Sequence, residues 1–294
     1  MSRKIDLMII DPQNSFCKVV PPEDQQKLHD GELCVPGAWD SICRVGNMVE
    51  RLGKKLNAIR VTLDSHHPFH IAHPTWFKDN SGNPPPYFTI MKNWNGAIAG
   101  SHAPDYSNSV EYSCTIPAMT KWTLDYLKAL EDGKRYPHCV WPNHCEIGTP
   151  GHNVIAPLYD ALRSWAISTQ STIDFVTKGS NVKTEHFSAV RSEVFDPDDL
   201  TTQLNTDFIT SFMEADEILL SGEALSHCLA NTVRDIANEF TVGSLGDNDE
   251  FIRKCVLLTD ASDNVPYFEK LGEDFVKEMV SRGMKTSTTT DYLN

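Results

Sequence analysis

The strongest constraint on the fold is a regular alternation between short apolar segments and longer segments with helical periodicity. Apolar residues recur at helical spacing over 42–52 and again over 225–240, and short apolar segments lie around these stretches. Strands that alternate with helices predict a parallel sheet covered by helices on both faces. Five strands are expected, at residues 5–11, 56–64, 172–178, 217–221 and 255–260.

A sixth strand, at the edge of the sheet, is expected at residues 284–290. It follows a predicted helix at 265–282, for which Gly283 supplies a stop signal. The predicted fold class is therefore α/β, with three α/β/α layers built around a central, parallel, doubly wound and Rossmann-like sheet of six strands.

The length of the chain sets its domain organisation. With 294 residues it can bury one large α/β core, and we expect a single domain over 1–294. Residues 71–136 depart from the alternation because they are rich in Pro, Asn, Gly, Ser and aromatic residues. We expect an insertion there, mostly a long loop with one short helix near 120–130. Such a long loop is unusual in a compact domain, which favours a role as a lid or an interface element.

Charge and composition exclude several classes of partner. Asp and Glu total 40 against 26 for Lys and Arg, so the formal net charge is −14. This charge repels phosphate backbones and anionic lipids, which argues against nucleic-acid and membrane partners. No apolar stretch approaches the roughly 20 residues of a membrane-spanning helix. The first residues are too few for a signal peptide and the eight cysteines have no repeating spacing, so we expect a cytoplasmic protein with reduced thiols.

Reactive side chains follow the predicted strands at the ends where ligands bind in open parallel sheets. These residues are Asp11, Asp64 with His66, Lys178, Cys228 and Asp260. Each Asp alone has a simpler explanation as a turn former or a helix cap, above all Asp260. Together they bring a thiol, an ammonium and carboxylates to one edge of the sheet.

Cys228 is the most informative of these positions. It lies in the first turn of the predicted helix after Gly222, where backbone donors and the helix dipole stabilise a thiolate. Lys178 and Asp11 add a charge partner and a proton carrier, which completes the set that covalent catalysis by a thiol needs. The alternative is a buried cysteine that only fills space.

A second group of residues has the chemistry of a metal site. Residues two apart in an extended segment point the same way, so Asp64 and His66 can bind one ion together, with a third ligand from elsewhere in the chain. Such a donor set suits Zn²⁺, Fe²⁺ or Mn²⁺. Two alternatives remain open: the histidines are solvated loop residues, or the later segment forms a structural zinc site through His138, Cys139, His144 and Cys145.

With these residues, the sequence resembles the cysteine hydrolases of the isochorismatase-like superfamily, and within it the nicotinamidases. The similarity spans residues 5–284 and its segments occur in the family's order. The segments are IIDPQNSFC (9–17), LCVPGA (33–38), DSH (64–66), WPNHC (141–145) with GTPG (148–151), KG (178–179), HFSA (186–189), SG to C (221–228) and TDA (259–261).

The resemblance implies a role for each matching residue. Asp11, Lys178 and Cys228 fall where the family has its catalytic triad. Asp64, His66 and His144 fall where nicotinamidases have metal ligands. The pair Glu223-Ala224 occupies the position of a non-proline cis peptide, and the N–H groups of Ala224 and Cys228 would form the oxyanion hole. Phe16 and Trp141 correspond to aromatic walls of the substrate pocket.

Some positions depart from the family's pattern. Ser15 stands where Asp is usual, and His227 where an aromatic residue is common. The connection between His66 and His144 is far longer than in most members, so His67 or His70 could replace one of the ligands named above.

These observations predict an amidohydrolase of the nicotinamidase type, which hydrolyses nicotinamide or a similar small aromatic carboxamide to the carboxylate and ammonia through a cysteine thioester. The expected cofactor is one divalent metal ion, Zn²⁺ before Fe²⁺ or Mn²⁺. The expected partner is a small-molecule amide, and the family makes a homo-oligomer plausible. The implied pathway is NAD salvage within pyridine nucleotide metabolism.

Three alternatives stay open. The first is a related cysteine amidase that acts on another small amide or a carbamoyl compound. The second is a metallohydrolase, in which the ion generates hydroxide and Cys228 is dispensable. The third is a catalytically silent, metal-binding interaction protein whose working surface is the insertion at 71–136.

Overall fold

The computed structural model describes residues 3–17, 32–102, 106, 108–243 and 249–294. Its centre is a six-stranded sheet in the order β11-β10-β9-β1-β2-β8, and every neighbouring pair in it is parallel. The predicted α/β fold with a doubly wound parallel sheet is confirmed, including a sixth strand at the edge. The strands are β1 (Ile5–Ile10), β2 (Leu56–Asp64), β8 (Asp174–Lys178), β9 (Glu217–Gly222), β10 (Cys255–Leu258) and β11 (Lys285–Ser287).

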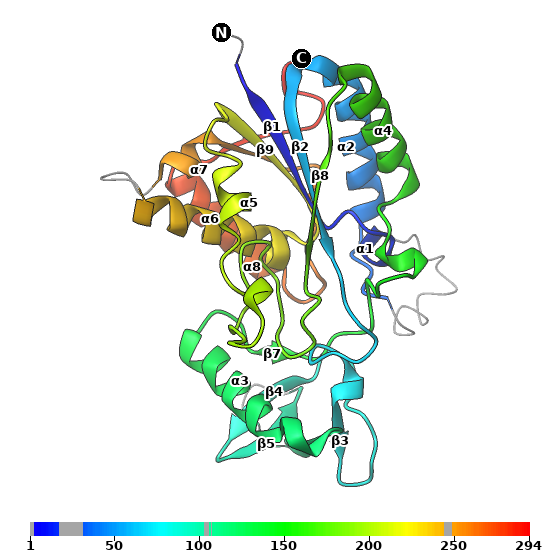
Figure 1. Cartoon of the computed structure of the whole chain (residues 1–294), viewed down its shortest axis with the longest axis vertical. Coiled ribbons are helices and arrows are strands. Elements are labelled where there is room, and N and C mark those ends of the chain that lie inside the picture. Colours follow the sequence, from blue (N-terminus) through cyan, green and yellow to red (C-terminus); the bar gives the residue numbers. More distant parts are fainter. Residues whose placement is uncertain (1–2, 18–31, 103–105, 107, 244–248) are drawn as a thin grey trace.

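Helices cover both faces of this sheet (Figure 1). One face carries α2 (Ala38–Leu52) and α4 (Ala156–Thr169), and the other carries α6 (Ala230–Gly243) and α8 (Glu269–Ser281). The alternation of side chains along β1 explains the two layers: Leu7 and Ile9 pack in the core with α2 and α4, whereas Met8 and Ile10 pack in the core with α6 and α8. The shorter helices are α1 (Asn14–Cys17), α5 (Thr206–Thr210) and α7 (Glu250–Lys254).

The segment at residues 71–136, where an insertion is expected, is not a long loop. Its strands form a second, antiparallel sheet in the order β3-β6-β5-β4-β7, and α3 (Thr120–Gly133) packs with it around a separate apolar core that includes Trp76, Phe77 and Tyr126. We call residues 71–139 the inserted lobe. Its strands are β3 (Phe77–Asp79), β4 (Ile90–Trp94), β5 (Ala97–Ser101), β6 (Val110–Cys114) and β7 (His138–Cys139).

The inserted lobe lies at the end of the main sheet where the parallel strands have their carboxyl ends (Figure 1). Short helical turns connect the larger elements. They are η2 (Gly53–Lys55), η3 (Pro74–Trp76), η4 (Pro117–Met119), η5 (Pro150–His152), η6 (Leu200–Thr202) and the π-helical turn η7 (Leu225–Leu229).

Several predicted boundaries differ from the structure by a few residues for identifiable reasons. Asp11 has a positive φ of 44° and leaves β1 after Ile10. The helix predicted from 265 begins at Glu269, because Tyr267 has a φ of 74°, which is not helical. In the described residues, no helix combines the length and the apolar character that crossing a membrane requires.

Gly222 allows β9 to end close against β1. Its φ is 111°, and a Cβ atom there would lie 2.1 Å from the carbonyl oxygen of Ile10. We predict that Gly222→Ala lowers the free energy of unfolding by about 3 kcal/mol, because backbone strain and an overpacked contact add together. Urea unfolding measures the loss.

Gly82→Ala is the matched control, since Gly82 has a φ of 87° but no heavy atom within 4 Å of an added Cβ. Only the backbone strain remains there, and we expect a loss of about 1 kcal/mol. Equal losses in the two variants would contradict the close approach of β9 to β1.

Candidate active site

The ends of two strands, β1 and β8, and the turn after β9 bring the predicted catalytic residues together. Asp11 follows β1, Lys178 ends β8, and Cys228 lies in η7. The Nζ atom of Lys178 is 2.9 Å from Oδ2 of Asp11 and 3.6 Å from Sγ of Cys228. All three residues are buried. The structure therefore unites a thiol, an ammonium and a carboxylate that are far apart in the sequence.

The neighbouring strand β2 fixes the position of Asp11. The backbone N–H of Asp11 donates to Oγ1 of Thr62 at 3.1 Å, and the hydroxyl of Thr62 donates to Oδ1 of Asp11 at 2.5 Å. Since Oδ2 faces Lys178, both carboxylate oxygens have a polar neighbour. Asp11 is thus held by groups that lie on two different strands.

Asp64, the last residue of β2, extends this network. Its Oδ1 atom is 3.1 Å from Nζ of Lys178, and its Oδ2 atom is 3.1 Å from Nε2 of His66 and 3.4 Å from Nε2 of His144. The carboxylate of Asp64 therefore links Lys178 to the two histidines. Through Lys178 it is also connected to Cys228.

Burial and neighbouring charges shift the pKa values in this network in opposite directions. Burial raises the pKa of Asp11, and Lys178 offsets only part of the rise. Burial would also raise the pKa of Asp64, but His66 and Lys178 outweigh it and hold that pKa well below its usual range. For Lys178, the two carboxylates outweigh burial, so its pKa lies well above the usual value and the ammonium stays charged.

The thiol of Cys228 differs from the sequence-based expectation. Burial raises its pKa well above the usual value, although Lys178 acts in the opposite direction. The beginning of the helix was expected to stabilise a thiolate, but the cysteine lies in a buried π-helical turn, where desolvation dominates. The resting group is a thiol, so its reaction as a nucleophile requires a base.

The histidines next to this network form a cluster that suits a metal ion. His66, His73 and His144 each present a nitrogen, and these donor atoms lie within 4.8 Å of one another. Nδ1 of His66 and both ring nitrogens of His73 are buried without a hydrogen-bond partner. Nδ1 of His144 contacts the carbonyl oxygen of Pro142 at 2.7 Å, which leaves its Nε2 for an ion. Such unpartnered buried nitrogens fit a divalent cation.

His73 is absent from the sequence-based ligand set of Asp64, His66 and His144. Burial lowers its pKa to about 2, so its imidazole is neutral, as a metal ligand must be. It comes from the beginning of the inserted lobe, just before η3. The group of histidines between 66 and 73 was the sequence signal for a further metal ligand. Spacing alone did not show which of them turns toward His66 and His144.

The alternative ligands that the sequence left open have other surroundings. His67 is exposed. Both ring nitrogens of His70 are engaged, one by the N–H of Ala72 at 3.0 Å and one by the carbonyl oxygen of Asn181 at 2.9 Å. His138 is likewise engaged, by Ile71 and Tyr126, so the structure does not bring it into a zinc site with Cys139, His144 and Cys145.

The predicted oxyanion-hole and wall residues surround one small cavity beside Cys228. The peptide bond between Glu223 and Ala224 is cis, at the position expected from the sequence. The free volume is about 20 Å³, so an aromatic ring can enter only if side chains move. The cavity is lined by Phe16, Leu33, Asp64, Trp141, His144, Glu185, Phe187, Ala224, His227, Cys228 and Val265.

Two further positions have structural roles. Asp260 accepts hydrogen bonds from the N–H and the hydroxyl of Thr289, at 2.7 and 2.6 Å, and so fixes the turn after β11. Ser15, which stands where the family usually has Asp, accepts a hydrogen bond from the N–H of Cys145 at 2.9 Å. Ser15 thus supports the loop that carries His144, whereas Asp260 supports the edge of the sheet formed by β10 and β11.

Comparison with solved structures shows that this fold is shared with nicotinamidases and pyrazinamidases. The yeast nicotinamidase bound to the inhibitor nicotinaldehyde is 17% identical with a TM-score of 0.58, and the match covers 97% of this chain and 99% of that chain. A nicotinamidase and pyrazinamidase from Acinetobacter baumannii is 18% identical with a TM-score of 0.58, covering 99% of each chain.

A pyrazinamidase from Pyrococcus horikoshii in complex with zinc is 18% identical with a TM-score of 0.50, covering 97% of this chain and 99% of that chain. The chain therefore has the isochorismatase-like fold. No protein-family model and no curated protein matches the sequence.

We predict that His73→Ala removes most of the bound metal, because the cluster loses one of its three nitrogen donors. Metal content is measured by elemental analysis after purification with added Zn²⁺. The control is His67→Ala, which changes an exposed histidine and is expected to keep the wild-type metal content. Full metal content in His73→Ala would rule out the three-histidine site.

Proposed function

We propose that the protein is a cysteine amidohydrolase of the nicotinamidase type, which hydrolyses nicotinamide or a similar small aromatic carboxamide to the carboxylate and ammonia. The observation that carries this proposal is the contact of Lys178 with both Asp11 and Cys228, since Cys228 also lines a cavity with aromatic walls. The fold shared with nicotinamidases supports it.

In this proposal Asp11 is the base and later the acid. Its raised pKa makes it a better acceptor for the thiol proton than an exposed carboxylate, and Lys178 contacts both Asp11 and Cys228. The sulfur of Cys228 attacks the carbonyl carbon of the amide and forms a tetrahedral oxyanion. Asp11 returns the proton to the departing nitrogen, and ammonia leaves the thioester.

Two features of the site stabilise the charges in this sequence. The ammonium of Lys178 lies beside the sulfur and beside the carboxylate, so it stabilises a negative charge on either group. The N–H groups of Ala224 and Cys228 are the proposed donors to the oxyanion, an arrangement worth about 3 kcal/mol for each donor in other enzymes. Water then attacks the thioester with Asp11 as base, which releases the carboxylate.

The metal site fits a role in positioning the substrate. His66, His73 and His144 would hold the ion, with Asp64 beside them. Zn²⁺ is the proposed ion because the donors are mainly nitrogen, and a zinc-bound protein of the same fold supports the choice. A bound ion would coordinate a ring nitrogen of the substrate and so orient the carboxamide toward Cys228.

The aromatic walls set the substrate class. Phe16, Trp141 and Phe187 line the cavity, and they favour a flat ring over an aliphatic amide. Since the free volume is only about 20 Å³, binding of a ring requires these side chains to move. Another small amide or a carbamoyl compound is the alternative substrate, and ammonia release from a panel of amides decides between them.

The cellular setting follows from the proposed reaction. Nicotinate production belongs to NAD salvage within pyridine nucleotide metabolism, and we propose a cytoplasmic enzyme. All eight cysteines are free thiols, which agrees with a reducing compartment. We also propose a homo-oligomer, on the basis of the sequence resemblance to the family.

We predict that Cys228→Ala lowers the rate of ammonia release from nicotinamide by more than about a thousandfold, because the nucleophile is lost. Its metal content should equal that of the wild type, since Cys228 is not among the metal donors. The matched control is Cys43→Ala, a partly buried cysteine on α2, which should keep its activity. An active Cys228→Ala enzyme would instead identify a metallohydrolase.

A further inference from the structure

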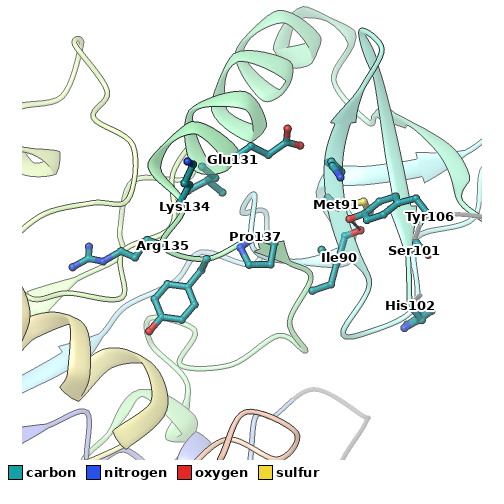
Figure 2. A pocket seen from close by; sticks show the side chains of 12 residues that line it. Ile90, Met91, Ser101, His102, Tyr106, Glu131, Lys134, Arg135 and Pro137 are labelled. Carbon is teal, nitrogen blue, oxygen red and sulfur yellow. Dashed lines mark hydrogen bonds between the residues drawn. The ribbon is translucent and has the colours of Figure 1, made fainter. Parts of the chain in front are cut away.

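A second cavity lies in the inserted lobe, outside the candidate active site. Its volume is about 580 Å³, within the range of small-molecule sites. Figure 2 shows that its labelled residues come from β4, from the end of β5 and the residues after it (His102 and Tyr106), from the end of α3, and from the segment that follows α3. The structure thus holds a cavity much larger than the one beside Cys228.

The inner surface of this cavity is apolar. Ile90 and Met91 contribute from β4, Leu130 from α3, and Pro137 from the segment that follows α3. Tyr106 adds an aromatic face and donates its hydroxyl hydrogen to the carbonyl oxygen of Ile90 at 3.0 Å. A flat apolar body can therefore lie against these side chains.

Two lysines bring positive charge to the cavity, where Glu131 supplies the one opposing carboxylate among the described lining residues. The Nζ atom of Lys92 lies 4.6 Å from the ring centre of Tyr106 and 4.9 Å from that of Trp94, in cation–π contacts. Lys134 is exposed at the end of α3. Within the described part of the chain, neither lysine forms a salt bridge. In a chain with a net charge of −14, two such cations in one cavity favour an anionic ligand.

The other charged groups of the cavity are already engaged. Arg135 is paired with Asp235 at 2.5 Å and with Glu193 at 3.5 Å, and Figure 2 shows its side chain directed away from Met91 and Tyr106. Glu131 accepts a hydrogen bond from the N–H of Asn93 at 3.1 Å. The lysines are therefore the groups that could hold an anion.

The cavity shares a wall with the catalytic segment. Tyr136 lines it, and the same ring stacks on His227 with 5.1 Å between ring centres. The hydroxyl of Tyr136 donates to the carbonyl oxygen of Ser226 at 3.1 Å. Ser226 and His227 directly precede Cys228, so one tyrosine contacts both the second cavity and the segment that holds the nucleophile.

We propose that this cavity is a second binding site, for a planar aromatic carboxylate, whose anion interacts with Lys92 and Lys134 while its ring lies against the apolar surface. The identification of the ligand rests on the proposed function, because the product of that reaction belongs to this chemical class. The existence of an anion site rests only on the cavity and its charges.

Isothermal titration calorimetry with nicotinate tests the proposal. In the wild type we expect a binding component that weakens as salt is added. Replacing both lysines, in Lys92→Gln with Lys134→Asn, should weaken this component about tenfold, because two charge contacts are lost. Asn is chosen because Lys134 has a positive φ of 53°, which Asn tolerates.

Two single variants should not weaken nicotinate binding if the anion site lies at Lys92 and Lys134. Glu131→Gln removes the opposing charge and should strengthen binding a few-fold, whereas Lys121→Gln, on an exposed part of the same helix, should leave it unchanged. Lys134→Asn alone should weaken binding a few-fold and serves if the double variant does not fold.

The result that would overturn the proposal is the absence of such a component, or one that the lysine variants do not weaken. Failure of the proposed function gives a different result. In that case no ammonia is released from nicotinamide, while the lysine-dependent component persists in the wild type and in Cys228→Ala.

Discussion

The buried ammonium of Lys178 is the interaction on which the site depends. An isolated charge in a protein interior is costly, and it persists only with partners of opposite charge. Lys178 has two, Asp11 and Asp64, at 2.9 and 3.1 Å, and the sulfur of Cys228 is its third neighbour. These partners end neighbouring strands or follow them, so the parallel sheet supplies the geometry that makes a buried lysine tolerable.

Asp64 shows how the two halves of the site depend on each other. One of its oxygens faces Lys178, and the other faces His66 and His144. Removal of this carboxylate would therefore leave the lysine with one partner and would also disturb the histidine cluster. The metal site and the nucleophile share one electrostatic network, which explains why their residues lie together although they come from six different segments.

Much of the main domain and of the thiol site could be predicted from the sequence. Buried parallel strands give continuous apolar segments, and their carboxyl ends meet at one edge, so Asp11, Lys178 and Cys228 could be grouped without coordinates. The lobe could not be recognised in this way. Its strands have two to five residues and are joined by segments rich in Gly and Pro, and such strands are too short to show an alternating pattern.

Two features of the site depend on tertiary contacts that no local pattern contains. His73 joins His66 and His144 because the chain turns at the beginning of the lobe. The raised pKa of Cys228 comes from burial, which outweighs the favourable position at the beginning of a helix. Likewise, the small free volume of the catalytic cavity reflects how Phe16, Trp141 and their neighbours pack together.

The most direct test of this account is mass spectrometry of the intact protein, quenched with acid within milliseconds of mixing with nicotinamide. We expect a transient increase in mass equal to one acyl group, which peptide mapping assigns to the peptide that contains Cys228. Steady turnover with no acyl adduct, or an adduct on another cysteine, would contradict the proposed role of the sulfur beside Lys178.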